Sequence, residues 1–233
     1  MARNTRSGRG RWRALAAALL LALGLAGYGW WWLQHWAPDP GRFRMQGVEV
    51  GAGDGQVDWP ALKAIGARFV WLDASVGASG IDPDFVRNLD DARTAGLLVG
   101  AVHRYDPCQP AERQAANFVT LVPRDPALLP PAIDLATLAD NCPVHVSDGA
   151  VESELMTFIN QIEMHTGKAA VLKLSPGFAR RYGAVTRFDR KLWLSRTVLE
   201  PAYAGRRWAL WTANPARSTE ASENPLRWTV AQP

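Results

Sequence analysis

Short apolar runs alternate with amphipathic stretches along most of this chain, from Gly47 to Thr212. Apolar runs of about four to eight residues are typical of parallel strands that are covered on both faces. Several of the intervening stretches begin with an N-cap residue followed closely by proline, as at Asp58, Asp82 and Ser175, which is a helix start signal. The pattern therefore predicts an α/β fold of repeated βα units. The expected strands span residues 47–51, 68–74, 97–103, 131–135, 169–174, 191–195 and 208–212.

Four polar side chains fall near the ends of these expected strands: Glu49, Asp73, His103 and Asp134. When βα units close into a barrel, the carboxyl ends of the strands share one face, and active sites lie on that face. The pattern alone therefore predicts that these four residues surround a common site.

The amino terminus has a different character, because a basic stretch precedes an apolar run from Ala14 to Leu33. A run of about 20 apolar residues is long enough to cross a bilayer as a helix. The arginines favour a cytoplasmic amino terminus, and tryptophans at the other end suit the far interface. These residues are Arg3, Arg6, Arg9, Arg11 and Arg13, and Trp30, Trp31, Trp32 and Trp36.

We therefore expect a cytoplasmic leader at 1–13, a transmembrane signal anchor at 14–36, a linker at 37–46 and a barrel domain at 47–233. This predicts a single-pass protein of the inner (cytoplasmic) membrane whose barrel faces the periplasm. The alternative is secretion after signal cleavage, since Gly24-Leu25-Ala26 is compatible with a cleavage site.

Composition agrees with one domain behind a leader, because 233 residues with 48% hydrophobic content can bury one substantial core. The net charge of +4 comes from the leader: without its five arginines, 21 basic residues face 22 acidic ones. The charge therefore gives no support for nucleic-acid binding. Cys108 and Cys142 both lie in the part expected to be exported, where a disulfide can form; two separate buried thiols are the alternative.

Several motifs together resemble glycoside hydrolase family 25, the lysozymes or N-acetylmuramidases of the Chalaropsis type. The stretches are similar to the family's GIDVS, G-x-IDW, FVYIKATEG, DPxF, GAYHF, QAANF, LWIA and WQY blocks, and LPPAIDLAT at 129–137 is similar to its catalytic strand PPAVDLE. The matching stretches are Gly47–Val50, Gly55–Trp59, Phe69–Gly77, Asp82–Phe85, Gly100–His103, Gln114–Phe118, Leu192–Leu194 and Leu210–Thr212. The resemblance implies a flattened, incomplete (β/α) TIM-like barrel that acts on peptidoglycan glycan strands. It also implies glycan contacts for His103, Asp73 and Trp211; for His103 the alternative is a hydrogen-bonded residue of the barrel wall.

The chain departs from the family where the chemistry lies. Ala136 stands in place of the acid glutamate, Val76 in place of the glutamate of ATEG, and Glu49 in place of the opening aspartate. Asp73 stands where the family has the lysine before ATEG, and Lys173 stands where the family has a strand tyrosine. The carboxyl-terminal VDLN block has no counterpart around residues 224–228. Glycoside hydrolysis needs a carboxylic acid and a second carboxylate or its equivalent, and Asp134 and Glu49 are the residual candidates for catalysis.

Three functions stay open on these grounds. The first is a peptidoglycan-associated module anchored in the inner membrane, with hydrolysis lost or strongly impaired. The second is an atypical muramidase that uses Glu49 and Asp134, and the third is an envelope protein-interaction module with an unidentified partner. We expect Asp73 and Lys173 to form an ion pair across the barrel mouth. No cofactor is implied, and no metal site is expected, because His35, His103, His145 and His165 lack ligand spacing.

Overall fold

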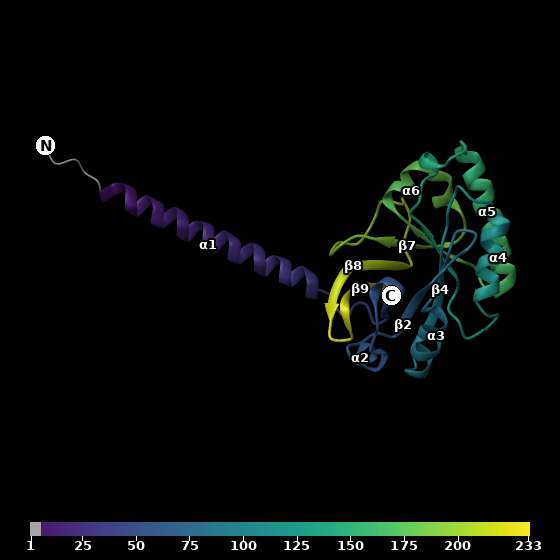
Figure 1. Ribbon diagram of the computed structural model, residues 1–233, viewed down its shortest axis with the longest axis horizontal. Helices are drawn as coiled ribbons and strands as arrows, with labels where there is room; N and C mark the ends of the chain where they lie inside the picture. Colours follow the sequence, from purple (N-terminus) through teal and green to yellow (C-terminus); the bar gives the residue numbers. More distant parts are fainter. Residues whose placement is uncertain (1–5) are drawn as a thin grey trace.

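A long amino-terminal helix, α1 (Arg6–His35), projects from an α/β barrel (Figure 1). The structure is a computed structural model that describes residues 6–233, and side-chain surroundings from residue 12 onward except at Asn141. Arg3 therefore lies outside the described residues, as do the surroundings of Arg6, Arg9 and Arg11. By length and composition, the segment Trp12–His35 could cross a membrane, and its apolar window is not buried against the barrel.

The barrel follows the predicted βα order. Its strands are β1 (Gln46–Val50), β2 (Phe69–Val76), β3 (Gly80–Ile81), β4 (Leu98–Arg104), β5 (Ala132–Leu135), β6 (Val171–Leu174), β7 (Lys191–Ser195), β8 (Leu210–Thr219) and β9 (Ser222–Ala231). Its helices are α2 (Trp59–Ala64), α3 (Phe85–Thr94), α4 (Ala111–Leu121), α5 (Asp148–Thr166) and α6 (Pro176–Arg181), with 3₁₀ turns η1 (Ala52–Asp54), η2 (Ala139–Asn141) and η3 (Gly183–Arg187).

The strand pairings form a ring, because the order β1-β9-β8-β7-β6-β5-β4-β2 is completed by pairing between β1 and β2. The predicted barrel class is confirmed, and the ring is closed where an incomplete barrel was expected. Closure comes from β9, which pairs antiparallel with both β8 and β1. The β8–β9 hairpin lies in the region where the sequence analysis placed no strand after Thr212.

Two of the three predicted helix starts have the expected chemistry. The side chains of Asp58 and Ser175 accept hydrogen bonds from Ala61 N and Phe178 N, at 2.9 and 3.1 Å. The prediction at Asp82 is wrong, because α3 begins at Phe85. Asp82 instead accepts a hydrogen bond from Ala52 N at 2.6 Å, so it fixes the turn after β1.

Side chains that point into the barrel form two layers. Strand residues alternate between faces, and the lower interior positions carry an apolar cluster of Phe69, Trp71, Val102, Ala132, Val171, Trp193 and Leu210. Asp73, Asp134 and Lys173 lie two residues beyond members of this cluster on β2, β5 and β6, so they point to the same face. They form a second layer at the carboxyl ends of the strands. The apolar layer therefore forms the floor beneath a charged layer.

The segment predicted as a linker is folded against the barrel. Phe43 is buried and packs against Trp208 and Trp211. The end of α1 is held as well, because Asn214 Nδ2 donates to the carbonyl oxygens of Leu33 and Trp36, at 2.8 and 3.0 Å. The Pro/Gly composition of 37–46 suggested a spacer, but its one phenylalanine joins the aromatic cluster, so helix and barrel are directly connected.

The disulfide between Cys108 and Cys142 is confirmed. It joins the loop after β4 to the loop after β5, which are adjacent parallel strands. The bridge therefore fixes two loops at the carboxyl-terminal end of the barrel, next to the charged layer.

Candidate active site

Lys173 occupies the centre of the charged layer and binds the two carboxylates that were candidates for catalysis. Its Nζ donates to Glu49 Oε1 and Oε2, at 2.5 and 2.7 Å, and to Asp134 Oδ2 at 3.2 Å. The Glu49 side chain is 1% exposed, and those of Lys173 and Asp134 are 13% exposed. Glu49 and Asp134 are thus present at the expected face, but an ammonium group lies between them.

Arg227, from β9, covers the same cluster from the other side. Its guanidinium lies 3.5 Å from Glu49 Oε2, 3.0 Å from Asp54 Oδ2 and 3.3 Å from Asp73 Oδ2. Register explains the approach, because Arg227 is paired with Glu49 across the β1–β9 ladder. Arg104 Nη2 lies 3.6 Å from Asp73 Oδ2 at the outer edge.

The expected pairing of Asp73 with Lys173 is therefore corrected. Lys173 bonds to Glu49 and Asp134, whereas the ion-pair partners of Asp73 are Arg227 and Arg104. Sequence alone gave no partner for Asp73 other than Lys173, because Arg227 was not assigned to a strand.

The charges in this cluster keep Glu49 ionised. Burial acts to raise the pKa of Glu49, but the nearby Lys173 and Arg227 outweigh it, so the pKa is lowered from its ordinary 4.5. Burial acts to lower the pKa of Lys173, but the negative charges of Glu49 and Asp134 outweigh it, so the pKa of Lys173 is raised. Near neutral pH the pair is a carboxylate and an ammonium ion, and Glu49 has no proton to donate as a general acid.

Asp73 has the opposite electrostatic character. Burial, followed by the negative charge of Glu49, raises the pKa of Asp73 to about 7. A carboxyl group with such a pKa is partly protonated near neutrality, as a general acid must be. Asp73 also lines an open pocket of about 350 Å³, together with Asp54, Arg104 and Arg227.

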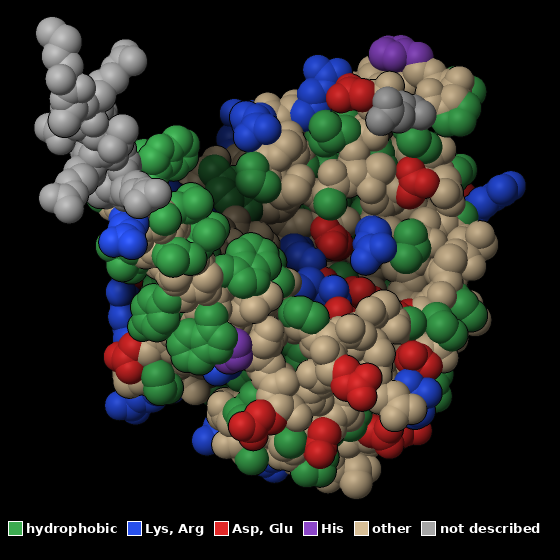
Figure 2. Space-filling view, turned by 60° about the vertical axis from the view of Figure 1, so that its left-hand side comes forward, with side chains coloured by type: hydrophobic (Ala, Val, Ile, Leu, Met, Phe, Trp, Pro, Cys, Tyr) green, Lys and Arg blue, Asp and Glu red, His purple; other side chains and the backbone are tan. Residues whose placement is uncertain are grey.

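This pocket lies at the strand ends but does not reach the innermost charged residues. Glu49, Asp134 and Lys173 are not among its lining residues. Figure 2 shows a hollow near the centre of one face of the molecule, where side chains of both charges lie next to one another. A ligand at this face would meet Asp73 and the two arginines before it reached the buried carboxylates.

The two positions that lack a glutamate are open to solvent. Ala136 is exposed one residue beyond the end of β5, and Val76 is 41% exposed at the end of β2. Neither methyl group can transfer a proton, and neither position is blocked by packing.

Two residues expected to contact glycan are inside the protein instead. His103 is fully buried, with Nδ1 2.8 Å from Ser75 Oγ and Nε2 3.2 Å from Gln114 Oε1. Burial lowers its pKa to about 4, so the ring is neutral. Trp211 is 2% exposed, and its indole N–H donates to the Arg196 carbonyl at 2.7 Å. Both side chains stabilise the barrel wall and present no surface to a sugar.

Arg227 is the site residue that sequence reasoning missed. A signal was present, because Leu226, Trp228 and Val230 alternate with Arg227 and Thr229, which is the pattern of a half-buried strand.

Comparison with known proteins agrees with the barrel fold. The family model "Glycosyl hydrolases family 25" matches residues 48–214. The chain belongs to glycosyl hydrolase family 25. A family 25 glycosyl hydrolase from Bacillus anthracis superposes with a TM-score of 0.76 at 25% identity, covering 85% of this chain and 92% of that one. The bacterial lysozyme from Streptomyces coelicolor shares the fold, with a TM-score of 0.72 at 18% identity over 81% and 92% of the two chains.

Relatives found by sequence include uncharacterised proteins and a lysozyme. Uncharacterized protein YegX of Escherichia coli K12 is 22% identical over 197 residues, which is 82% of this chain and 71% of YegX. Lysozyme M1 of Streptomyces globisporus is 32% identical over 59 residues, or 25% of this chain and 20% of that protein. These likenesses support a lysozyme-like fold here.

Proposed function

We propose that this protein is a membrane-anchored, lysozyme-like domain that associates with peptidoglycan and has lost the ability to hydrolyse it. The observation that carries the proposal is the position of Lys173 between Glu49 and Asp134. Where a glycoside hydrolase needs one carboxylic acid and one available carboxylate, this site has two carboxylates bound to the same ammonium ion.

The alanine at the position of the acid glutamate also supports the loss of hydrolysis. General acid catalysis typically contributes about 10²–10⁴-fold to the rate, and Ala136 can contribute none of it. Glu49 cannot replace the acid, because Lys173 and Arg227 hold it ionised. Both chemical requirements for glycan cleavage are therefore impaired at once.

The α1 helix supports the membrane part of the proposal. Its segment Trp12–His35 has a mean hydropathy of 1.6 over its most apolar window, and at about 1.5 Å per residue a helix of this length can span a bilayer core. Because Asn214 binds the end of α1 directly, the barrel would stand at the membrane surface without a flexible spacer.

Amino-terminal analysis of the membrane fraction distinguishes anchor from signal peptide, since cleavage would give a chain starting near Gly27.

The binding claim is tested with full-length protein in detergent, mixed with purified peptidoglycan sacculi and sedimented. We expect the protein to pellet with sacculi and Arg104→Ala to pellet less, because Arg104 lines the open pocket and is 49% exposed. Arg113→Ala, at an exposed position on α4, is the matched control. Equal pelleting of the wild type with and without sacculi would contradict binding.

A second candidate function is an altered muramidase in which Asp73 is the acid. The observation favouring it is that Asp73 is both accessible from the pocket and raised to a pKa of about 7. In that case muropeptide release would follow the protonation of Asp73, falling as the pH rises above 7, and Asp73→Asn would abolish it. A protein that binds sacculi without releasing muropeptides over this pH range excludes the second candidate.

A further inference from the structure

A second hollow lies at the opposite end of the barrel from the ion-pair cluster. It has a volume of about 750 Å³. It is lined by residues that precede β5, β6, β7 and β8, by the first residues of β7, and by Gln232 just after β9. Hollows of roughly 300–1,000 Å³ are the usual size for small-molecule sites. No residue of this hollow takes part in the lysozyme-like site.

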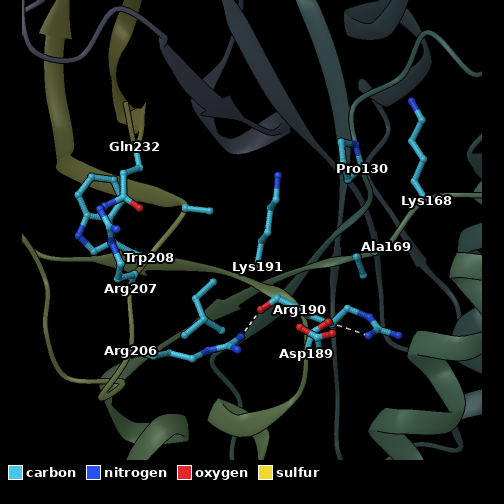
Figure 3. A pocket seen from close by; sticks show the side chains of 13 residues that line it. Pro130, Lys168, Ala169, Asp189, Arg190, Lys191, Arg206, Arg207, Trp208 and Gln232 are labelled. Atoms are coloured by element: carbon cyan, nitrogen blue, oxygen red, sulfur yellow. Dashed lines mark hydrogen bonds between the residues drawn. The ribbon is translucent and has the colours of Figure 1, made fainter.

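The lining is strongly basic. It includes Lys168, Arg190, Lys191, Arg206 and Arg207, with Asp189 as an acidic neighbour. Figure 3 shows Lys191 rising between the side occupied by Trp208 and Gln232 and the side occupied by Pro130 and Lys168. Basic side chains from separate parts of the chain thus converge on one hollow.

Hydrogen bonds within the protein hold some of these basic side chains in place, so the hollow has a defined arrangement of charges. Arg190 Nη2 donates to Glu163 Oε2 at 2.7 Å, and Lys168 Nζ donates to the Pro126 carbonyl at 2.7 Å. Arg206 donates through Nη2 to the Arg190 carbonyl. Its Nε is buried and has no hydrogen-bond partner among the described residues.

Charge compensation inside the hollow is incomplete. Glu163 offsets Arg190, and Asp189 can offset one further cation, whereas Lys168, Lys191, Arg206 and Arg207 together bring four positive charges. Lys191 and Arg207 are exposed, so their charged ends can reach a ligand. Guanidinium and ammonium groups arranged in this way favour phosphate and carboxylate groups.

We propose that this hollow binds the phosphate or carboxylate group of a ligand that arrives from the aqueous phase. Its position separates it from the proposed membrane anchor, because Asn214, in the middle of β8, contacts the end of α1, whereas the hollow reaches Ala209, which directly precedes that strand. Five residues of a strand correspond to roughly 16 Å. A soluble oxyanion therefore fits the site better than a lipid headgroup.

The test uses the full-length protein in detergent, titrated with inorganic pyrophosphate by calorimetry at low ionic strength. We expect saturable binding that weakens with added salt, since exposed charges are screened. Lys191→Gln combined with Arg207→Gln should weaken binding by about tenfold or more, because charge-assisted hydrogen bonds are lost. Arg113→Gln should bind like the wild type.

Three outcomes would overturn the proposal. The first is an absence of pyrophosphate binding at concentrations up to about 1 mM, which corresponds to roughly −4 kcal/mol. The second is equal binding by the double variant and the wild type when both give the same circular dichroism spectrum. The third is binding to anionic phospholipid vesicles through Lys191 and Arg207 without any binding of soluble pyrophosphate, which would identify a lipid headgroup as the ligand.

Discussion

Replacing Lys173 with methionine tests the ion-pair cluster most sharply. Methionine keeps a long unbranched side chain over the Trp193 ring, which Lys173 Nζ approaches at 5.2 Å, but it removes the ammonium. Glu49, whose side chain is 1% exposed in the wild type, then keeps only Arg227 as an ion-pair partner, at 3.5 Å. The variant therefore contains a buried carboxylate that has lost both hydrogen bonds that it accepts from Lys173.

The magnitude follows from that loss. Removing one partner of a buried ion pair costs about 3–5 kcal/mol, and the remaining Arg227 favours the lower end, about 3 kcal/mol. For a domain of this size each kcal/mol shifts Tm by about 2–4 °C, so Tm should fall by about 6–12 °C at pH 7.5. Burial would now prevail over the remaining positive charge and raise the pKa of Glu49. The deficit relative to wild type should therefore shrink as the pH falls and Glu49 becomes protonated.

The assay is thermal unfolding of full-length protein in detergent, followed by near-ultraviolet circular dichroism between pH 4.5 and 7.5. Glu49→Gln added to Lys173→Met should recover much of the lost stability, because neither partner is then charged. The reasoning is refuted if Lys173→Met is as stable as the wild type at pH 7.5. It is refuted equally if the double variant is no more stable than the single one.

Three further predictions concern the same end of the barrel. Replacing Cys108 and Cys142 by serine should lower the free energy of unfolding by about 3–4 kcal/mol in the chain-entropy model, given their sequence separation of 34; an unchanged denaturant midpoint would contradict this. Because burial and Glu49 raise the pKa of Asp73 from 3.8 to about 7, the folded state binds the extra proton between these values and loses stability as the pH rises. Between pH 4 and 8 the free energy of unfolding of Asp73→Asn should thus rise by on the order of 2–4 kcal/mol relative to that of the wild type. If the two free energies changed in parallel with pH, the shifted pKa of Asp73 would be refuted. Ala136→Glu alone should release no muropeptides, whereas Ala136→Glu with Lys173→Tyr should release them above background, because the acid is restored and Lys173 no longer binds both carboxylates; equal activity of the two would show that Lys173 does not block the site.

The βα order and the strand positions could be predicted from sequence because buried parallel strands form short apolar runs with distinctive ends. Glu49, Asp73 and Asp134 were assigned to one face for the same reason, and the structure places all three there. Their ion-pair partners could not be predicted. Which cation meets which carboxylate depends on strand register and on Arg227, more than 150 residues away along the chain from Asp73.

The misplaced expectations have physical causes of the same kind. His103 and Trp211 are polar or amphipathic residues near strand ends, and composition does not reveal whether such a side chain faces the cleft or the surrounding helices. His103 turned outward toward α4 and α5, where Gln114 and Phe158 hold it. The segment 37–46 contains a single phenylalanine. One apolar residue shows no periodicity, so the sequence did not indicate that this segment packs against the barrel.

Muropeptide release from purified sacculi by the unmodified full-length protein tests the central claim most directly. We predict no release above that of heat-inactivated protein between pH 5 and 8, because Ala136 supplies no acid and Lys173 binds both Glu49 and Asp134. Sustained release that Asp134→Asn abolishes would contradict it.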